Sequence, residues 1–327
     1  MPRVSVGAQY HAGLPAGPDH RGLMALLLLT ACNIVIVLLW TAAGHWTLSD
    51  PHWTRFYLMV ASVGLPLLVP RYRADPKLVT ALATTMAMMI FSRSAGILDY
   101  LLVSTNAPLV DAALARWDNA LGFDWVGHGR WLHQHRWLEQ LLGWVYMSLL
   151  VQFAVVIIYL GFTGRYRELS DFCGVLVLTT VIGDVVSVLW PAAGASKHFA
   201  AQLVSDVSML SDFEPLRNGM LRSIPVDAVQ GLVSIPSFHT ILALLFMNAM
   251  RGTRLALPFV LLNTLVLLST PRFGGHYLVD MIGGVVVWGG RSAGLAYAGF
   301  ARGCDSLAVV DTAFESNGLA RRSLGSA

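Results

Sequence analysis

Charged residues are scarce in this chain: Asp, Glu, Lys and Arg make up 13% of its 327 residues, against roughly 25% in soluble domains. This deficit, together with a hydrophobic content of 55%, excludes an ordinary water-soluble protein. The net charge of +3 comes from dispersed residues, so the concentrated basic patch of a nucleic-acid-binding protein is missing. Cysteine is also rare, and its three copies, Cys32, Cys173 and Cys304, lack the paired spacing of a disulfide framework or a metal site.

Long apolar runs take the place of the missing charge. A helix needs about 20 apolar residues to cross a hydrocarbon core about 30 Å thick. Eight runs approach or exceed that length: 22–44, 54–70, 78–104, 138–163, 169–190, 236–250, 254–270 and 276–299. We therefore predict an all-α polytopic membrane protein with about eight transmembrane helices, surrounded by membrane lipids.

The short connections between these runs differ in charge. Those on the side of the N-terminus carry seven basic residues: Arg71, Arg73, Lys77, Arg165, Arg167, Arg251 and Arg254. The short connections on the other side carry only Arg272. Because short cytoplasmic loops are enriched in Lys and Arg, we expect both termini to be cytoplasmic. We also expect a single membrane domain over 21–300, with its catalytic core at about 138–299, between mobile cytoplasmic tails at 1–20 and 301–327.

Two long connections, 105–137 and 191–235, fall on the outer side. The first contains Trp117, Trp125, Trp131 and Trp137, and tryptophan is enriched at membrane interfaces. It predicts one or two helices lying on the outer surface. The second connection is polar and leads directly into "SIPSFHT". It is the natural place for the headgroup of a substrate.

Two histidines are predicted at the outer ends of helices. His239 begins one span, and two crossings later His276 begins the last, so both lie on the same side. His276 and Asp280 are four residues apart, which places them on one helical face. A carboxylate there can bind one ring nitrogen of the histidine and fix its tautomer. Ionisable groups at this depth are costly and usually functional, so the three residues predict a reaction site.

The two helix starts predict an anion site beside the histidines. Unpaired N–H groups and the positive end of the helix dipole favour phosphate there. Pro236 suits the first helical position, and Ser237 adds a hydroxyl donor. Gly274 and Gly275 allow the backbone to approach a ligand closely.

The quoted residues resemble those of the type 2 phosphatidic acid phosphatase superfamily. "IPSFHT" is similar to its Pro-Ser-x-His motif, and "GGHYLVDMIGG" to its His-x-x-x-Asp motif. Weaker likeness in "WDNALGFDW", "YMSLLVQ" and "WPAAG" extends the resemblance over about 100–290, closest to the branch of inositol phosphorylceramide synthases. The resemblance implies a six-helix phosphatase-like core within the membrane domain.

The resemblance also implies a phosphohistidine mechanism without metal or cofactor. His276 would attack phosphorus, Asp280 would orient it, His239 would protonate the leaving oxygen and Ser237 would hold phosphoryl oxygens. The upstream Lys-x6-Arg-Pro motif of the family is absent, and Arg272 lies four residues before His276 instead of six. The phosphate clamp is therefore sought among four cations: Lys197, Arg217, Arg222 and Arg272.

Three functions remain open at this point. The first is hydrolysis of a phosphorylated lipid at the extracytoplasmic face, and the second is transfer of its phosphoryl group to an alcohol such as inositol or a sugar. The third is a transporter or lipid-flipping protein in which the buried His and Asp residues relay protons. The roles of Arg93, Asp99 and Asp184, which lie within predicted spans, are likewise open. We expect His128, His133 and His135 to be surface residues, since their spacing matches no common metal site.

Overall fold

The computed structural model describes residues 20–49, 53–202, 211–226 and 229–290. The two predicted tails, Cys304 and the end of the last predicted span lie outside these residues. Five helices in the described part are long and apolar enough to cross a membrane: α1 (Arg21–Gly44), α4 (Pro76–Val103), α7 (Arg136–Phe162), α8 (Tyr166–Leu189) and α12 (Ala256–Phe273). They coincide with five of the eight predicted spans and confirm an all-α polytopic membrane protein.

The other three predicted spans are shorter apolar helices. They are α2 (Trp53–Gly64), which continues into the 3-10 helix η1 (Leu65–Leu68), α11 (Phe238–Ala249), and a helix over Leu278–Gly290. The 12 residues of α11 span about 18 Å at 1.5 Å per residue, less than the hydrocarbon thickness. By itself, α11 is therefore too short to cross the hydrocarbon core.

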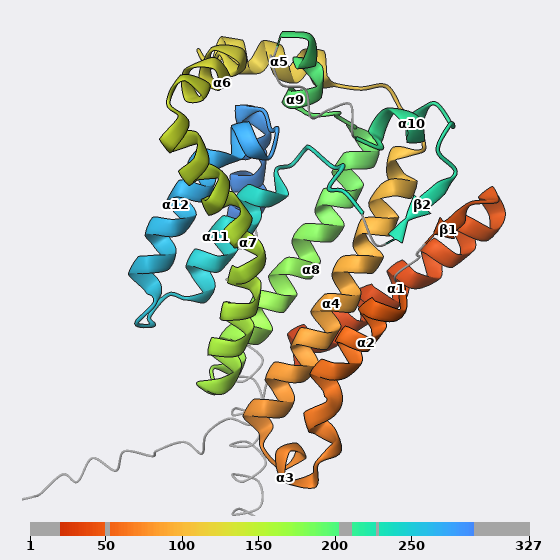
Figure 1. The fold of residues 1–327 in the computed structure, drawn as a ribbon, viewed down its shortest axis with the longest axis vertical. Helices are drawn as coiled ribbons and strands as arrows, with labels where there is room; N and C mark the ends of the chain where they lie inside the picture. Colours follow the sequence, from red (N-terminus) through yellow and green to blue (C-terminus); the bar gives the residue numbers. More distant parts are fainter. Residues whose placement is uncertain (1–19, 50–52, 203–210, 227–228, 291–327) are drawn as a thin grey trace, which may run out of the picture.

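The two ends of the bundle differ in character (Figure 1). At one end lie α3 (Pro70–Arg73) and the turns that follow α7 and α11, where Arg165 donates a hydrogen bond to the carbonyl of Arg251 (3.2 Å). We call this the basic end. The opposite, covered end carries five short helices: α5 (Asp111–Ala120), α6 (Trp125–Gln134), α9 (Ala195–His198), η2 (Ala200–Gln202) and α10 (Phe213–Arg217).

A two-stranded parallel sheet ties the connection between α1 and α2 to the connection between α8 and α11. Strand β1 (Thr47–Ser49) pairs with β2 (Ser223–Pro225). Arg222 lies over the Trp46 ring at 4.9 Å, immediately before this pairing. These contacts fix the segment that leads into α11.

The core of the bundle is apolar and lies among α4, α7, α8, α11 and α12. Phe172 and Phe246 stack at 5.9 Å, and Phe153 meets Phe246 edge-on at 4.9 Å. One buried polar pair crosses this core, because Asn263 donates to the side-chain oxygen of Gln152 at 2.7 Å. Such pairs hold membrane helices in register, since an unpaired amide in hydrocarbon is costly.

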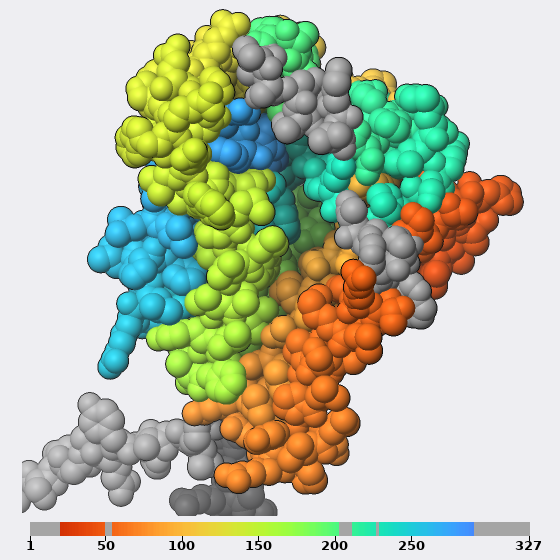
Figure 2. Space-filling model, in the orientation of Figure 1, coloured from red at the N-terminus to blue at the C-terminus, as the bar shows by residue number. Residues whose placement is uncertain are grey.

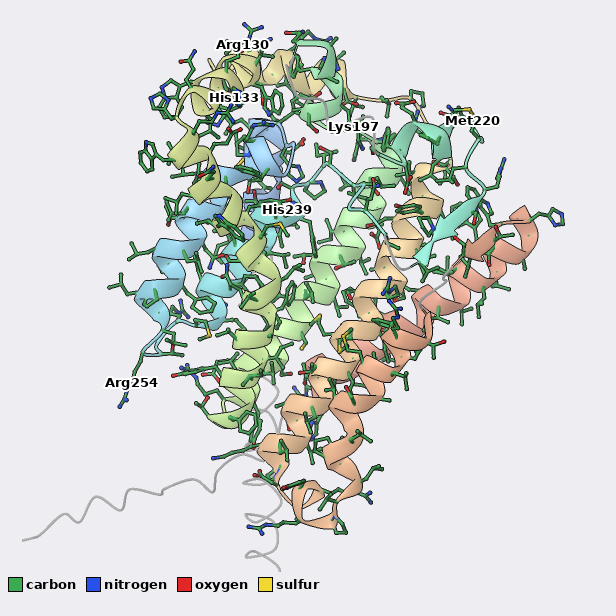
Figure 3. All side chains as sticks on the ribbon, viewed as in Figure 1. Arg130, His133, Lys197, Met220, His239 and Arg254 are labelled. Carbon is green, nitrogen blue, oxygen red and sulfur yellow. The ribbon has the colours of Figure 1, made fainter. Side chains whose placement is uncertain are left out.

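The face in Figure 2 is hollowed between α7 and the orange segments that include α4, with α8 at the floor. Along α8, which the structure describes in full, no residue beyond Thr180 is buried. The last third of α8 therefore lies under an opening in the side of the bundle. His239, labelled in Figure 3, lies beside α7 at the upper part of this region.

Candidate active site

His239 occupies the first turn of α11. Ser237 is the N-cap: its hydroxyl accepts from the Thr240 amide at 3.4 Å and from the Thr240 hydroxyl at 3.2 Å. The Ser237 amide donates to the backbone carbonyl of Asp280 at 3.0 Å. Pro236 stands before the N-cap, so its predicted place at the first helical position is wrong. Phosphate binding by Ser237, which is fully buried, stays a prediction.

His276 lies two residues before the helix Leu278–Gly290. The start of this helix is capped by Asp118 of α5, whose two carboxylate oxygens accept from the amides of Leu278 and Val279, both at 2.9 Å. Two charge-assisted bonds of this kind satisfy donors that the helix itself leaves free. The free anion-binding amides predicted at this helix start are therefore wrong, because a carboxylate of the same chain already occupies them.

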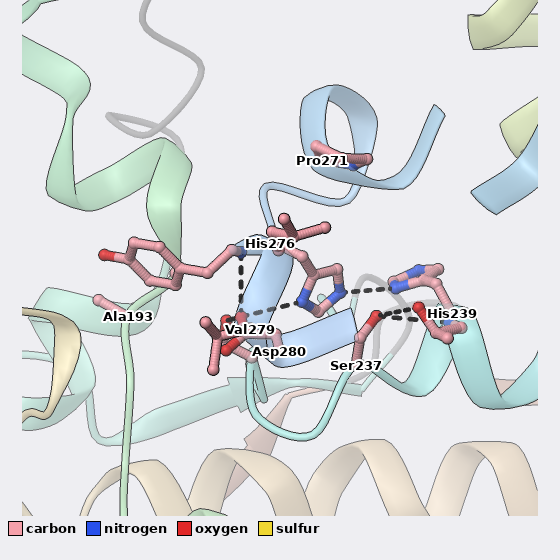
Figure 4. A network of polar contacts seen from close by, with 12 residues as sticks. Ala193, Ser237, His239, Pro271, His276, Val279 and Asp280 are labelled. Atoms are coloured by element: carbon pink, nitrogen blue, oxygen red, sulfur yellow. Dashed lines mark hydrogen bonds and ion pairs between the residues drawn. The ribbon is translucent and has the colours of Figure 1, made fainter. Parts of the chain in front are cut away.

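The two histidines and the aspartate form one polar chain (Figure 4). His276 Nδ1 lies 3.4 Å from Asp280 Oδ2, and His276 Nε2 lies 3.0 Å from His239 Nδ1. On the far side, His239 Nε2 meets the hydroxyl of Tyr146 at 2.5 Å. The expected contact between His276 and Asp280, and the meeting of the two histidines, are confirmed; their catalytic roles stay predictions.

One assignment of protons satisfies every contact in this chain while both imidazoles are neutral. Asp280 can only accept when ionised, so neutral His276 carries its proton on Nδ1 and accepts at Nε2. His239 must then donate from Nδ1, which leaves its Nε2 as an acceptor for the Tyr146 hydroxyl. Every donor has one acceptor with both imidazoles neutral. The arrangement brings His276 Nε2 and His239 Nδ1 face to face, the first as acceptor and the second as donor.

The direct contact between the rings has a geometric consequence. A phosphorus atom in contact with His276 Nε2 needs the space that His239 Nδ1 occupies at 3.0 Å. In-line displacement also requires the leaving oxygen opposite the attacking atom. If His276 attacks phosphorus, the substrate must therefore part the two imidazoles and lie between them.

Asp280 is held by further bonds. Its Oδ2 accepts from the Ser234 hydroxyl at 2.7 Å and from the Tyr277 amide at 3.2 Å. The side chain is fully buried, and its Oδ1 has no hydrogen-bond partner among the described residues. Orientation of this carboxylate toward His276 is thus fixed from two segments, the loop before α11 and the loop before the last helix.

A second buried carboxylate supports the same loop. Asp111, at the start of α5, accepts from the amides of Ala193 and Gly194 at 2.8 and 2.9 Å and from the Tyr277 hydroxyl at 3.0 Å. The Tyr277 phenol is the donor in the last of these contacts. Asp111 in this way joins the "PAAG" loop to the residue that follows His276.

Asp118 and Trp125 hold His276 from the covered end. Burial raises the pKa of Asp118, against the two amide bonds, which lower it. Trp125 donates its indole N–H to the carbonyls of Pro271 and His276, each at 3.1 Å. It is buried, so its predicted place in an interfacial belt is wrong. Trp117, Trp131 and Trp137 are exposed, as such a belt requires.

A cavity of about 300 Å³ lies beside these two residues at the covered end. Asp118, Asn119, Asp124, Trp125 and Phe199 are among its lining residues. Neither histidine lines it, and Trp125 stands between the cavity and the carbonyl of His276. The cavity is therefore separate from the reacting atoms.

The four predicted phosphate-binding cations have other contacts. Arg217 donates to the carbonyl of Ala107 at 2.7 Å, and Arg222 lies over the Trp46 ring. Arg272 pairs with Glu139 at 3.2 Å, while its Nε is buried without a hydrogen-bond partner in the described part of the chain. None of these arginines donates to either histidine, all of these residues being described. Their phosphate contacts stay predictions.

Lys197 differs from the arginines. Its ammonium lies 4.4 Å from the centre of the Phe213 ring. Burial lowers its pKa to about 8, against the carboxylates of Glu214, Asp111 and Asp212, which raise it. Figure 3 shows Lys197 between α9 and α10, on the covered-end side of His239. It is a cation close to loss of its proton at physiological pH.

The remaining residues left open by the sequence are partly explained. Arg93 lies over the Phe56 ring at 4.4 Å, a cation–π contact between α4 and α2. His133 pairs with Glu139 at 3.2 Å, and His135 packs on Trp131 at 4.5 Å. The roles of Asp99 and Asp184 stay open.

Sequence reasoning missed Asp111, Asp118, Tyr146 and Ser234 as parts of the site. Asp111 and Asp118 are seven residues apart and so share one face of α5, a signal that two carboxylates point inward from a surface helix. Tyr146 and Ser234 lie in segments noted only for weak likeness or polarity. Their contacts depend on packing across 46 to 93 positions of the chain.

Helices long and apolar enough to span a membrane, with two imidazoles in contact and a buried carboxylate beside them, define a polytopic membrane protein with a buried polar site. The family model described as the PAP2 superfamily matches residues 112–293, more than half of the chain. The chain therefore belongs to the PAP2 superfamily, and its activity is of the phosphatase or phosphotransferase type. No curated protein and no solved structure matches it.

Proposed function

We propose that this protein cleaves a lipid phosphate ester at the extracytoplasmic face of the cytoplasmic membrane, through a phosphohistidine intermediate. One observation carries the proposal: the continuous chain Asp280, His276, His239, with contacts of 3.4 and 3.0 Å. It supplies an oriented nucleophile and a facing acid within one site.

In the first step, substrate parts the two imidazoles and His276 Nε2 attacks phosphorus. The P–N bond forms as the P–O ester bond breaks, and the electron pair of that bond goes to the leaving oxygen. That oxygen takes the Nδ1 proton of His239, which enters the step as the imidazolium after taking a proton from water and leaves the step neutral. Asp280 holds the Nδ1 proton of His276 and stabilises the positive charge that develops on its ring, in the way a carboxylate orients and stabilises a catalytic histidine.

In the second step, a water oxygen attacks phosphorus and the P–N bond breaks. Its electron pair returns to His276 Nε2, and His239 Nδ1 takes the proton from the water. Splitting one displacement into two in this way is the usual gain from nucleophilic catalysis. An alcohol in place of water gives phosphoryl transfer without change to the other groups.

A lipid substrate is supported by the hollow in the side of the bundle (Figure 2). Its floor, the last third of α8, lies where acyl chains pack around a membrane protein, and His239 is close to its upper part. A substrate could place its chains there and its phosphate between the histidines. The exposed residues Trp131, Trp137 and Trp144 are consistent with a membrane interface at this level.

The extracytoplasmic location of the site is supported by charge. The basic end carries the arginine-containing turns, and the histidines lie toward the opposite, covered end. Because positive short loops favour the cytoplasm, we place the covered end outside and both termini inside. We retain the single membrane domain over 21–300 as part of this proposal.

The test is release of inorganic phosphate from phosphatidic acid, and from a panel of other lipid phosphates, by purified protein in detergent. We expect release by wild type and a loss of at least a hundredfold in His276→Ala, because the nucleophile is gone. The matched control is His133→Ala, which changes a partly exposed histidine outside the predicted site. Full activity in His276→Ala would refute the mechanism.

The products separate hydrolysis from transfer. With inositol or a sugar added, a phosphorylated acceptor in place of free phosphate would favour the branch that resembles inositol phosphorylceramide synthases. Movement of lipid in vesicles with no phosphorus chemistry at all would favour the transporter alternative instead.

A further inference from the structure

We propose that Tyr146 is a positioning residue for His239, which fixes the ring plane and the tautomer that present Nδ1 to the leaving group. The inference rests on the proposed function, because it assigns a device that serves the acid of that reaction. Tyr146 lies in "YMSLLVQ", outside the two paired motifs.

The contact is close and involves both the hydroxyl and the ring. Tyr146 is in α7, 93 positions from His239, and its hydroxyl lies 2.5 Å from Nε2. Its ring packs against the imidazole with centroids 4.9 Å apart and an angle of 31° between the planes. Phe273 covers the other part of the tyrosine ring at 6.2 Å. The phenol is therefore held in place, and it holds the imidazole in turn.

The hydroxyl selects which nitrogen of His239 faces the reaction. In the resting chain the phenol donates to Nε2, so the imidazole proton is on Nδ1, beside His276. When substrate enters and His239 becomes protonated, Nε2–H can donate to the same phenol oxygen, because a hydroxyl both donates and accepts. One bond thus orients the ring in both protonation states. Nδ1 is left to give its proton to the leaving oxygen and to take one back from water.

Removal of the hydroxyl frees the imidazole to rotate and to place its proton on either nitrogen. The cost falls on proton transfer, which positioned general acids accelerate by about 10²–10⁴-fold. The loss of rate is therefore expected only for substrates whose leaving oxygen needs that proton. An alkoxide from a lipid needs it, whereas para-nitrophenolate leaves as a stable anion.

The experiment compares Tyr146→Phe with wild type on two substrates, phosphatidic acid and para-nitrophenyl phosphate. The measured quantity is kcat/KM, because it reports formation of the phosphoenzyme and excludes its later hydrolysis. We expect a loss of about 10–100-fold on phosphatidic acid and less than about threefold on the aryl substrate. The retained aryl activity also shows that the variant folds.

The matched control is Tyr159→Phe, the same chemical change in the same helix. Tyr159 packs against the apolar core, and we expect it to leave both substrates unchanged. Equal losses on both substrates in Tyr146→Phe, no loss on phosphatidic acid, or the same pattern in Tyr159→Phe would each overturn the inference. His276→Ala tests the proposed function separately, since loss of the nucleophile abolishes both activities whatever the role of Tyr146.

Discussion

Asp118 gives the sharpest test of how the site is built. Its carboxylate accepts the amides of Leu278 and Val279, each at 2.9 Å, and so fixes the start of the helix that follows His276. Asp118→Ala leaves both amides without a partner. A buried donor left unpaired costs about 1–3 kcal/mol, which gives about 2–6 kcal/mol for the pair.

The lower part of that range is expected. Asp118 lines the cavity of about 300 Å³, so water can enter and bind one of the amides, as waters do in polar cavities. We therefore expect a loss of about 2–3 kcal/mol in Asp118→Ala. Asp118→Asn keeps one acceptor oxygen and should lose about half as much. The loss of phosphate release should be larger than this loss of stability alone explains, because displacement of a reacting group by 1 Å can lower the rate about a hundredfold.

Asp124 provides a matched control from the same cavity. It caps α6 by accepting the Gly127 amide at 2.9 Å, but it is exposed and does not contact the loop of His276. Loss of such a cap costs about 1 kcal/mol. The assays are the thermal unfolding midpoint in detergent and phosphate release from phosphatidic acid. Equal activity of Asp118→Ala and Asp124→Ala would refute the view that Asp118 positions His276.

Two further predictions concern the loops around the site. Lys197 has a pKa of about 8. If it binds the substrate phosphate, its charge and that contact are lost as pH rises from 7 to 9, and KM should rise by up to about tenfold. Lys197→Arg, which stays protonated, should abolish this rise in KM. A KM independent of pH in wild type would exclude the contact. Gly275 has a φ of 65°, and a Cβ there would collide with Ser196 Oγ, so Gly275→Ala should reduce kcat at least about a hundredfold by moving His276. The control is Gly219→Ala, where φ is 75° and the nearest atom is the end of the Arg222 side chain at 3.6 Å. There only a backbone cost of about 1–2 kcal/mol in stability is expected. Similar activity in Gly275→Ala and Gly219→Ala would contradict this account.

The membrane fold could be predicted because its signal is local. A span must be about 20 apolar residues long whatever it packs against, so α1, α4, α7, α8 and α12 were located within a few residues. The short helices were less well predicted. The run 54–70 contains Pro66 and Pro70, which stand at the starts of η1 and α3. Because the run is apolar throughout, its length alone predicted one span, although proline is a signal for such breaks.

The candidate site was predictable in part for the same reason. A four-residue spacing brings His276 and Asp280 together, and two crossings return His239 to their side. The supporting groups carry no such signal. Trp125 has the sequence character of an interfacial residue, yet it is buried with its N–H on the carbonyl of His276.

The sequence by itself determined that this is a membrane protein, where its long helices lie, and which three side chains could form a phosphoryl-transfer site. Hydrophobic length and helical periodicity suffice for this, because both act over a few turns of chain. Only the tertiary structure decided that the imidazoles touch, that Asp118 already occupies the helix start, and that Tyr146 bonds Nε2 of His239. Each is a contact between residues 37 to 161 positions apart, and such contacts arise from the packing of whole helices.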